Sequence, residues 1–355
     1  MQIVLNPKDF GLHASVLTDA AQSAVEELLR EGESANTLAS YRSALRYWAA
    51  WHQMRYVCPI QLPVSVPSIL QFIVDHAERT TEKGLVSELP PFIDTALVNA
   101  GHKGKPGPLS HNTLVHRIAV LSKAHQIQGM TNPCHDAKVR ELLSRTRKAY
   151  AKRGVLPDKK DALTKDPLQL ILASCDDSLR GHRDRALLLF AWASGGRRRS
   201  EVANADMKFL RRVPNGYTYS LGHSKTNQAA RDRPENDKPL LGSAAIAMTT
   251  WLKVSGIVDG PIFRQVRKGG YLGPALVAAA VRDIVQYRAS LSNVQGNFSA
   301  HSLRSGFITE AGRQNMPLAE TMAMTGHQSV ASVVGYSRAG ATLSSPVARL
   351  FDKFE

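Results

Sequence analysis

Hydrophobic side chains recur at helical spacing in the first half of the chain. Two stretches carry apolar residues at steps of three and four, the period that places them on one helix face: Leu38, Tyr41, Leu45 and Trp48 in the first, and Leu114, Ile118 and Leu121 in the second. Asn36 and Thr37 are suited to cap the first helix. Residues 81–108, rich in Gly, Pro and Lys, predict a loop around one short helix.

Beyond residue 160 the pattern predicts helices and one hairpin. A helix is expected over 166–175 with Thr164 as its cap, and a buried helix over 183–194. Residues 217–241 alternate, break at a polar stretch and resume, as a β-hairpin with a long tip would. Helical patterns return from Ala244 to the end. The expected fold is therefore mainly α, with a small antiparallel β-sheet in the second half.

A strongly basic segment lies between the two halves. It holds a single acid, Glu141, and its basic residues are Lys138, Arg140, Arg145, Arg147, Lys148, Lys152 and Arg153. Such a segment suits either a solvated helix face or contact with a phosphate backbone, which attracts clustered Lys and Arg.

Residues that break helices follow this basic segment. Gly154 and Pro157 interrupt the helical pattern, so we expect an interdomain linker at 151–163. The chain then divides into a domain over 1–155 and a second domain over 156–355. A length of 355 residues is about right for two domains.

The whole chain is basic, with 45 Lys and Arg against 30 Asp and Glu and a formal net charge of +15. This sign attracts polyanions such as nucleic acid or an anionic membrane surface. No membrane partner is expected, because the apolar run 186–193 is far shorter than the roughly 20 residues that a span requires. The N-terminus also lacks the pattern of a signal peptide. Cys58, Cys134 and Cys175 are widely separated, which suits the cytoplasm and predicts neither disulfides nor a zinc site.

Three consecutive arginines follow the predicted buried helix. Arg197, Arg198 and Arg199 have one acid nearby, Glu201, and one carboxylate cannot neutralise three cations. A buried guanidinium without a partner is costly. Either two of the arginines lie in solvent or the missing anion belongs to a ligand.

Four places in the second half carry side chains that could take part in a reaction. They are Arg198 with Glu201, Lys225 in the hairpin, His301 with Arg304, and His327 with Tyr336. Taken singly, each has an ordinary explanation as a surface pair, a solubilising lysine or a packing tyrosine. Together they supply guanidinium forks for a phosphodiester, imidazoles for proton transfer and a phenol as nucleophile. No group of Asp, Glu, His or Cys has metal-ligand spacing, so the protein itself must supply the positive charge.

In this order the residues resemble the tyrosine recombinase (phage integrase) family, and within it the Cre-like and Xer-like members. The matching segments are Gly196–Glu201, Lys225, His301–Arg304, Gly326-His327 and Tyr336, and residues 251–270 also resemble a Cre-type stretch. The spacings from Arg304 to His327 and from His327 to Tyr336 are similar to those usual in the family. The resemblance covers the second domain, and the helical first domain fits more loosely.

The resemblance implies a two-domain, C-shaped clamp around DNA, made of a helical core-binding domain and a catalytic domain. It implies that Arg198 and Arg304 bind the scissile phosphate and stabilise charge in the transition state. Tyr336 would attack the phosphate, giving a 3′-phosphotyrosyl link and a free 5′-hydroxyl, with neither ATP nor another cofactor.

The same resemblance assigns supporting roles to four more residues. Lys225 would be the general acid for the leaving hydroxyl, His301 would assist proton transfer, and His327 would donate to a phosphate oxygen. Glu201 would orient Arg198 or His301 without touching substrate.

Two of these assignments have competitors. Arg197 or Arg199 would replace Arg198 if the register slipped by one, but the Ser200-Glu201 pair favours Arg198 as the inward arginine. Arg197 stands where the family often has a hydrophobic residue, and we expect it in solvent or on phosphate. Lys208 and Lys238 compete with Lys225, which is favoured by its place in the hairpin.

The expected partner is double-stranded DNA with an inverted-repeat site, bound by a homodimer on one site and by a tetramer in synapsis. The tail carries Val347, Leu350, Phe351 and Phe354 on one helix face. That face packs on its own domain or, as the resemblance favours, docks into a neighbouring subunit. The protein is expected in the cytoplasm, associated with the nucleoid, and of prokaryotic, phage or mobile-element origin. Two alternatives remain: a type IB topoisomerase-like enzyme, and an inactive DNA-binding regulator.

Overall fold

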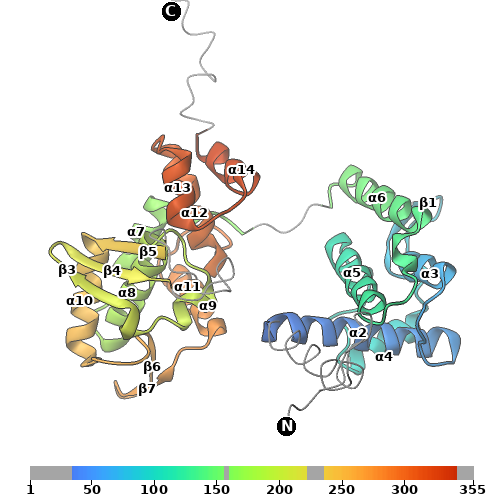
Figure 1. The fold of residues 1–355 in the computed structure, drawn as a ribbon, viewed down its shortest axis with the longest axis horizontal. Helices are drawn as coiled ribbons and strands as arrows, with labels where there is room; N and C mark the ends of the chain where they lie inside the picture. Colours follow the sequence, from blue (N-terminus) through green and yellow to red (C-terminus); the bar gives the residue numbers. More distant parts are fainter. Residues whose placement is uncertain (1–33, 156–159, 222–235, 342–355) are drawn as a thin grey trace, which may run out of the picture. The chain divides into compact units, whose positions relative to one another are not determined.

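The computed structural model describes residues 34–155, 160–221 and 236–341. The chain divides into two compact units, Met1–Pro157 and Asp158–Glu355 (Figure 1). Each unit has a hydrophobic core of its own. The predicted boundary after residue 155 lies close to this division. The prediction of a mainly α fold with antiparallel β-structure is confirmed.

The first unit is helical apart from one short hairpin. Its elements are α2 (Ala35–Tyr56), α3 (Val66–His76), β1 (Arg79–Thr81), β2 (Gly84–Val86), α4 (Pro91–Asn99), α5 (His111–Ile127), the 3-10 turn η1 (Pro133–His135) and α6 (Ala137–Lys152). The segment 81–108 thus holds the expected short helix, α4. The β1–β2 hairpin was not predicted, because three-residue strands leave too short a pattern to recognise.

Aromatic side chains form the centre of the first core. Trp48 stacks on Phe72 with ring centroids 3.7 Å apart, and Trp51 meets the same ring edge-on at 5.0 Å. The buried indole N–H of Trp51 donates to Asp75 at 2.9 Å, which satisfies the polar atom.

The structure corrects two details of α2. Its cap is Ser34, whose hydroxyl accepts from the backbone N–H of Thr37 at 3.1 Å, rather than Asn36 or Thr37. Leu45 was expected on the buried face but is 38% exposed. The helix instead turns its bulkiest side chains inward, because Tyr47, Trp48 and Trp51 bury more apolar area than the leucine does.

The second unit combines helices with two small sheets. Its elements are α7 (Lys165–Ala173), α8 (Leu179–Ala193), α9 (Arg199–Ala203), η2 (Met207–Phe209), β3 (Leu210–Val213), β4 (Gly216–Ser220), β5 (Asp237–Leu241), α10 (Ser243–Ser255), β6 (Arg264–Val266), β7 (Leu272–Ala275), α11 (Ala278–Leu291), α12 (Ala300–Arg313), α13 (Leu318–Thr325) and α14 (Val330–Ala341). The predicted hairpin is the antiparallel pair β4–β5, with Tyr217 opposite Leu240. Strand β3 on its other edge and the β6–β7 pair were not predicted.

Helix α8 lies at the centre of the second core, as its continuous apolar run predicts. Leu187 and Leu188 are fully buried, and Phe190 packs edge-on against Tyr219 and Phe263 at 5.0 and 5.4 Å. The helix therefore contacts both the sheet and the segment before β6, and its C-terminal end is held in a fixed place. The arginine run begins there.

The predicted linker at 151–163 is too long. Helix α6 continues to Lys152, and Leu163 is fully buried in the second core. The Leu163 carbonyl accepts from Trp192 at 3.1 Å, and its N–H donates to Ser302 at 2.9 Å. The charged residues and Pro157 are typical of a linker, so the sequence did not indicate that the end of this segment is ordered.

Two predicted features lie outside the described residues: Lys225 in the hairpin, and the apolar face of the tail over residues 345–355. Within the described ranges, none of the helices has the length and apolar character needed to cross a membrane.

The packing of α12 on α14 depends on a glycine. A Cβ at Gly312 would lie 2.2 Å from the carbonyl oxygen of Ser337, whereas a Cβ at Gly335 meets nothing within 4 Å. We expect Gly312→Ala to lower the free energy of unfolding by about 1–3 kcal/mol, because backbone must move. Chemical denaturation measures this.

The matched control is Gly335→Ala in α14. With open space around it, this change should be neutral or stabilise by up to about 1 kcal/mol, since Ala favours helix over Gly. Equal losses in the two variants would contradict the close approach of α12 and α14.

Candidate active site

The turn between α8 and α9 is built by two glycines. Gly195 and Gly196 have φ values of +93° and +70°, a region that favours glycine. A Cβ at Gly195 would lie 2.2 Å from the Met324 carbonyl oxygen, and one at Gly196 would lie 2.3 Å from the Cα of Arg304. The glycines therefore reverse the chain and let α12 and the end of α13 approach the arginines.

The three arginines have different environments. Arg197 is 2% exposed, the side chain of Arg198 is 27% exposed, and Arg199 is exposed. The expectation that Arg198 is the inward member, with Arg197 in solvent or on phosphate, is wrong. Arg197 turns inward because backbone carbonyls receive it: its guanidinium donates to Met324 at 2.7 Å and to Gly195 at 3.3 Å.

Glu201 holds the arginine turn together. Its carboxylate accepts from the guanidinium of Arg198 at 2.7 Å and from the backbone N–H of Arg198 at 3.1 Å. The other nearby cation, Arg197, is 3.7 Å away. Burial raises the pKa of Glu201, but the two arginines outweigh it and the pKa of the carboxyl is lowered. Glu201 is therefore an ionised anchor, as predicted for its contact with Arg198.

Helix α12 supplies His301 and Arg304. Ser299 caps this helix, accepting from the N–H of His301 at 3.3 Å. His301 is exposed on the first turn, and Arg304, one turn later, is 3% exposed. Arg304 donates to the carbonyls of Gly196 at 3.0 Å and Thr325 at 2.7 Å. These bonds orient the guanidinium of Arg304 toward the α8–α9 turn.

His327 follows the end of α13. The helix stops at Gly326, which is left-handed (φ +69°), and so directs the chain back toward α12. The imidazole lies against Arg304, with one guanidinium nitrogen 3.1 and 3.2 Å from the two ring nitrogens. Its Nδ1 also lies 2.8 Å from the Thr325 hydroxyl.

Tyr336 lies in the middle of α14. Val333, one turn earlier, is fully buried and anchors the helix, while Tyr336 is 38% exposed. The ring of Tyr336 faces His301 edge-on, with centroids 6.4 Å apart and planes inclined at 65°. An exposed phenol thus stands beside the cationic cluster within one subunit.

Burial and the mutual repulsion of its cations dominate the electrostatics of this cluster. Burial and the nearby arginines lower the pKa of Arg304 to about 9 and the pKa of His327 to about 4. Burial, followed by Arg304 and Arg198, also lowers the pKa of His301. Each shift runs in the direction that a bound anion would reverse. Chemically, the cluster can hold one phosphodiester beside a nucleophile and two imidazoles.

The alternative lysines have other surroundings. Lys238 on β5 is 2% exposed and donates to the Ala323 carbonyl at 2.7 Å. Lys208 is exposed above the ring of Phe209, 4.9 Å from its centroid. The sequence contains a signal for the burial of Lys238, because this residue alternates along the strand with Leu240, which is also buried.

The basic residues predicted to bind DNA belong to α6, except Arg153, which caps the end of this helix. The exposed members are Lys138, Arg140, Arg145, Arg147, Lys148 and Lys152. Arg153 differs, because its guanidinium donates to the Glu78 carbonyl at 3.0 Å and lies over the Tyr150 ring. Arg153 therefore supports the fold of the first unit, and its DNA contact stays a prediction.

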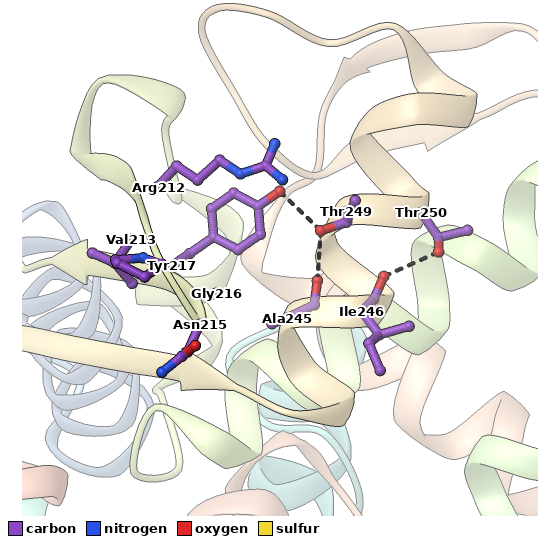
Figure 2. A pocket seen from close by; sticks show the side chains of 10 residues that line it. Arg212, Val213, Asn215, Gly216, Tyr217, Ala245, Ile246, Thr249 and Thr250 are labelled. Carbon is purple, nitrogen blue, oxygen red and sulfur yellow. Dashed lines mark hydrogen bonds between the residues drawn. The ribbon is translucent and has the colours of Figure 1, made fainter.

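A hollow of about 300 Å³ lies elsewhere in the second unit, between the β3–β4 turn and α10 (Figure 2). Its hydroxyls satisfy one another: Tyr217 and Thr249 are 3.0 Å apart, and Thr249 donates to Ala245 at 2.9 Å. It is lined by none of the predicted site residues. In the part of the chain that the structure describes, no three His, Cys, Asp or Glu side chains are placed to hold a metal ion.

Known proteins resemble the chain in sequence and in fold. Residues 161–342 match the family model described as the phage integrase family. A curated relative, the integrase/recombinase xerD homolog of Selenomonas ruminantium, is 27% identical over 322 residues, covering 88% of this chain and 84% of the relative.

Two solved structures share the fold at 15% identity. The Tn1549 transposon integrase in complex with transposon right end DNA has a TM-score of 0.55 and covers 92% of this chain and 98% of its own. A lambda integrase tetramer bound to a Holliday junction has a TM-score of 0.51, with coverage of 90% and 76%.

Removing the carboxylate of Glu201 should expose the cost of burying Arg197. We expect Glu201→Gln to lower the free energy of unfolding by about 3–5 kcal/mol at pH 7, because a buried cation loses its anion. The folded-state pKa of Glu201 is depressed, so its stabilisation is present above the unfolded value of 4.5 and is lost as the pH falls through the folded value. Urea unfolding at pH 7 and at pH 4 measures both effects.

The control is Asp283→Asn, which removes an exposed carboxylate paired with Arg282 in the same unit. It should change stability by no more than about 0.5 kcal/mol at either pH. A Glu201→Gln variant as stable as this control would refute the anchoring role.

Proposed function

The chain belongs to the phage integrase family of tyrosine recombinases, and from this premise we propose that it cleaves and rejoins DNA strands through a 3′-phosphotyrosyl intermediate. Site-specific DNA recombination is the activity that the family supports. One observation carries the proposal of a 3′-phosphotyrosyl intermediate. A single cluster of basic side chains is formed by Arg198, Arg304, His301 and His327, and the exposed ring of Tyr336 lies beside it.

The arginines suit the recognition of one phosphate. Arg198 is partly exposed and tethered by Glu201, so its free donors can reach a ligand. Arg304 is oriented by two carbonyls and retains donors on the same guanidinium. Two fixed forks stabilise the charge that develops on the equatorial oxygens better than mobile ammonium groups do.

In the proposed reaction the Tyr336 oxygen attacks phosphorus while the bond from phosphorus to the 5′ oxygen breaks. One ester replaces another, so the bond energy is kept for rejoining. His301 lies beside the Tyr336 ring and can help to accept the phenolic proton. Lys225 would give the proton that the 5′ oxygen needs, and His327 would donate to a phosphate oxygen.

We further propose that duplex DNA with an inverted repeat is bound by a dimer, and that two such sites meet in a tetramer. The Tn1549 integrase structure contains transposon end DNA, and the lambda integrase structure is a tetramer on a Holliday junction. Both units would contact the duplex. With a bacterial relative, we place this work at the DNA in the cytoplasm.

Replacing the nucleophile tests the reaction directly. The recognition site is first selected by affinity from random duplexes, and a version nicked near the cleavage point then traps the covalent product. We expect a DNA adduct with the wild type and none with Tyr336→Phe, because only the hydroxyl is removed. Denaturing gel electrophoresis detects the adduct, and a gel shift confirms equal binding.

The other readings give different outcomes in this experiment. A wild type that binds but forms no adduct supports an inactive regulator and overturns the proposal. An adduct without strand exchange between two sites supports a topoisomerase-like enzyme.

The exposed face of α6 should add affinity without sequence preference. Replacing Arg147 and Lys148 by Gln removes up to two phosphate contacts. We expect weaker binding to any duplex and a salt dependence whose slope falls by about 0.9 for each lost contact. Fluorescence anisotropy on unrelated DNA across a salt series measures the slope.

Arg282→Gln is the control for surface charge, because Arg282 is exposed and paired with Asp283. It should leave the slope close to that of the wild type. An unchanged slope in the α6 double variant would exclude this face as a DNA contact.

A further inference from the structure

The end of α13 is surrounded by buried cations. Its last three residues each offer the carbonyl oxygen to one of them, at 2.7 Å in every case: Ala323 to Lys238, Met324 to Arg197, and Thr325 to Arg304. The cations come from β5, the α8–α9 turn and α12. Carbonyls at a helix C-terminus carry partial negative charge and lack partners within the helix, so three separate elements are joined at this point.

Arg197 takes no part in the proposed reaction, yet its side chain is more deeply buried than those of Arg198 and Arg199. It is 2% exposed, and its Nε has no hydrogen-bond partner. Burial lowers the pKa of this guanidinium to about 10. An apolar side chain would avoid the cost of desolvating a charge. The bonds that Arg197 makes must therefore have a use that packing alone does not require.

Those bonds connect the two halves of the cluster. On one side, Arg197 lies 3.7 Å from Glu201, the carboxylate that orients Arg198. On the other side, it bonds the Met324 carbonyl, three residues before His327.

We propose that Arg197 is a positioning residue for strand cleavage: by bonding Met324 and facing Glu201, it fixes the spacing between Arg198 and His327 on either side of the phosphate. This inference rests on the proposed function. Arg197 does not touch the substrate, and its charge adds to the field around His327. The charged and titratable groups acting on that imidazole are Arg304 and His301 of α12 and Arg197 and Arg198 of the turn.

The test compares two variants. Arg197→Met keeps a long side chain but removes the hydrogen-bond donors and the charge of the guanidinium, whereas Arg197→Lys keeps the charge alone. Arg199→Met is the matched control, because Arg199 is exposed. With saturating DNA on the nicked substrate, we expect cleavage to slow about 10- to 100-fold in Arg197→Met, the scale of a misplacement near 1 Å. DNA affinity should change by less than about 3-fold, since no phosphate contact is lost.

The two variants separate geometry from charge. Arg197→Lys should also cleave slowly, because one ammonium cannot reproduce the fork. Histidine NMR in the DNA-free protein should show the pKa of His327 rising in Arg197→Met and staying near the wild-type value in Arg197→Lys. A purely structural residue would change stability without this split between rate, affinity and titration.

The outcomes distinguish this inference from the function beneath it. Wild-type cleavage rates in folded Arg197→Met and Arg197→Lys, or losses equalled by Arg199→Met, overturn the positioning role alone. If Arg197→Met does not fold, as thermal unfolding would reveal, Arg197→Lys decides by its rate. A wild type that binds DNA without forming an adduct overturns the proposed function and this inference together.

Discussion

Positive charge without a matching anion governs the centre of the second unit. Three arginines and two histidines meet there, and among the described residues Glu201 is the carboxylate paired with the arginines. Backbone carbonyl groups, rather than further carboxylates, receive the buried guanidinium groups. Carbonyls of the α8–α9 turn and of the end of α13 receive the guanidinium groups of Arg197 and Arg304. The arrangement stays folded while retaining donors for an external anion, which is what a phosphate site requires.

Close backbone approach makes this arrangement possible. Gly195 and Gly196 bring the turn against α13 and α12, and Gly312 brings α14 against α12. Side chains at these positions would separate the elements that carry the arginines, His301 and Tyr336. The geometry of the candidate site and the packing of the second unit are therefore a single property, because both depend on how closely α12 is approached from two sides.

Much of the fold followed from local pattern. The helices around Leu114 and over 183–194 were predicted because their apolar residues keep one period over several turns. The errors have a common cause. The errors concern the burial of Leu45, the linker at 151–163 and the missed β1–β2, β3 and β6–β7 strands. Each depended on which of several adjacent residues forms a tertiary contact. Short strands and segment ends have too little pattern to settle that choice, and tertiary contacts settle it instead.

The sequence by itself determined the family of the chain, the division into two parts and the identity of the candidate residues, because residue type and order carry that information. Only the tertiary structure decided which arginine turns inward. Arg197, Arg198 and Arg199 are chemically identical neighbours, so nothing local distinguishes them. The difference arises from the Met324 carbonyl that α13 presents to Arg197, and Met324 lies more than a hundred positions away, so its placement is not contained in a local pattern.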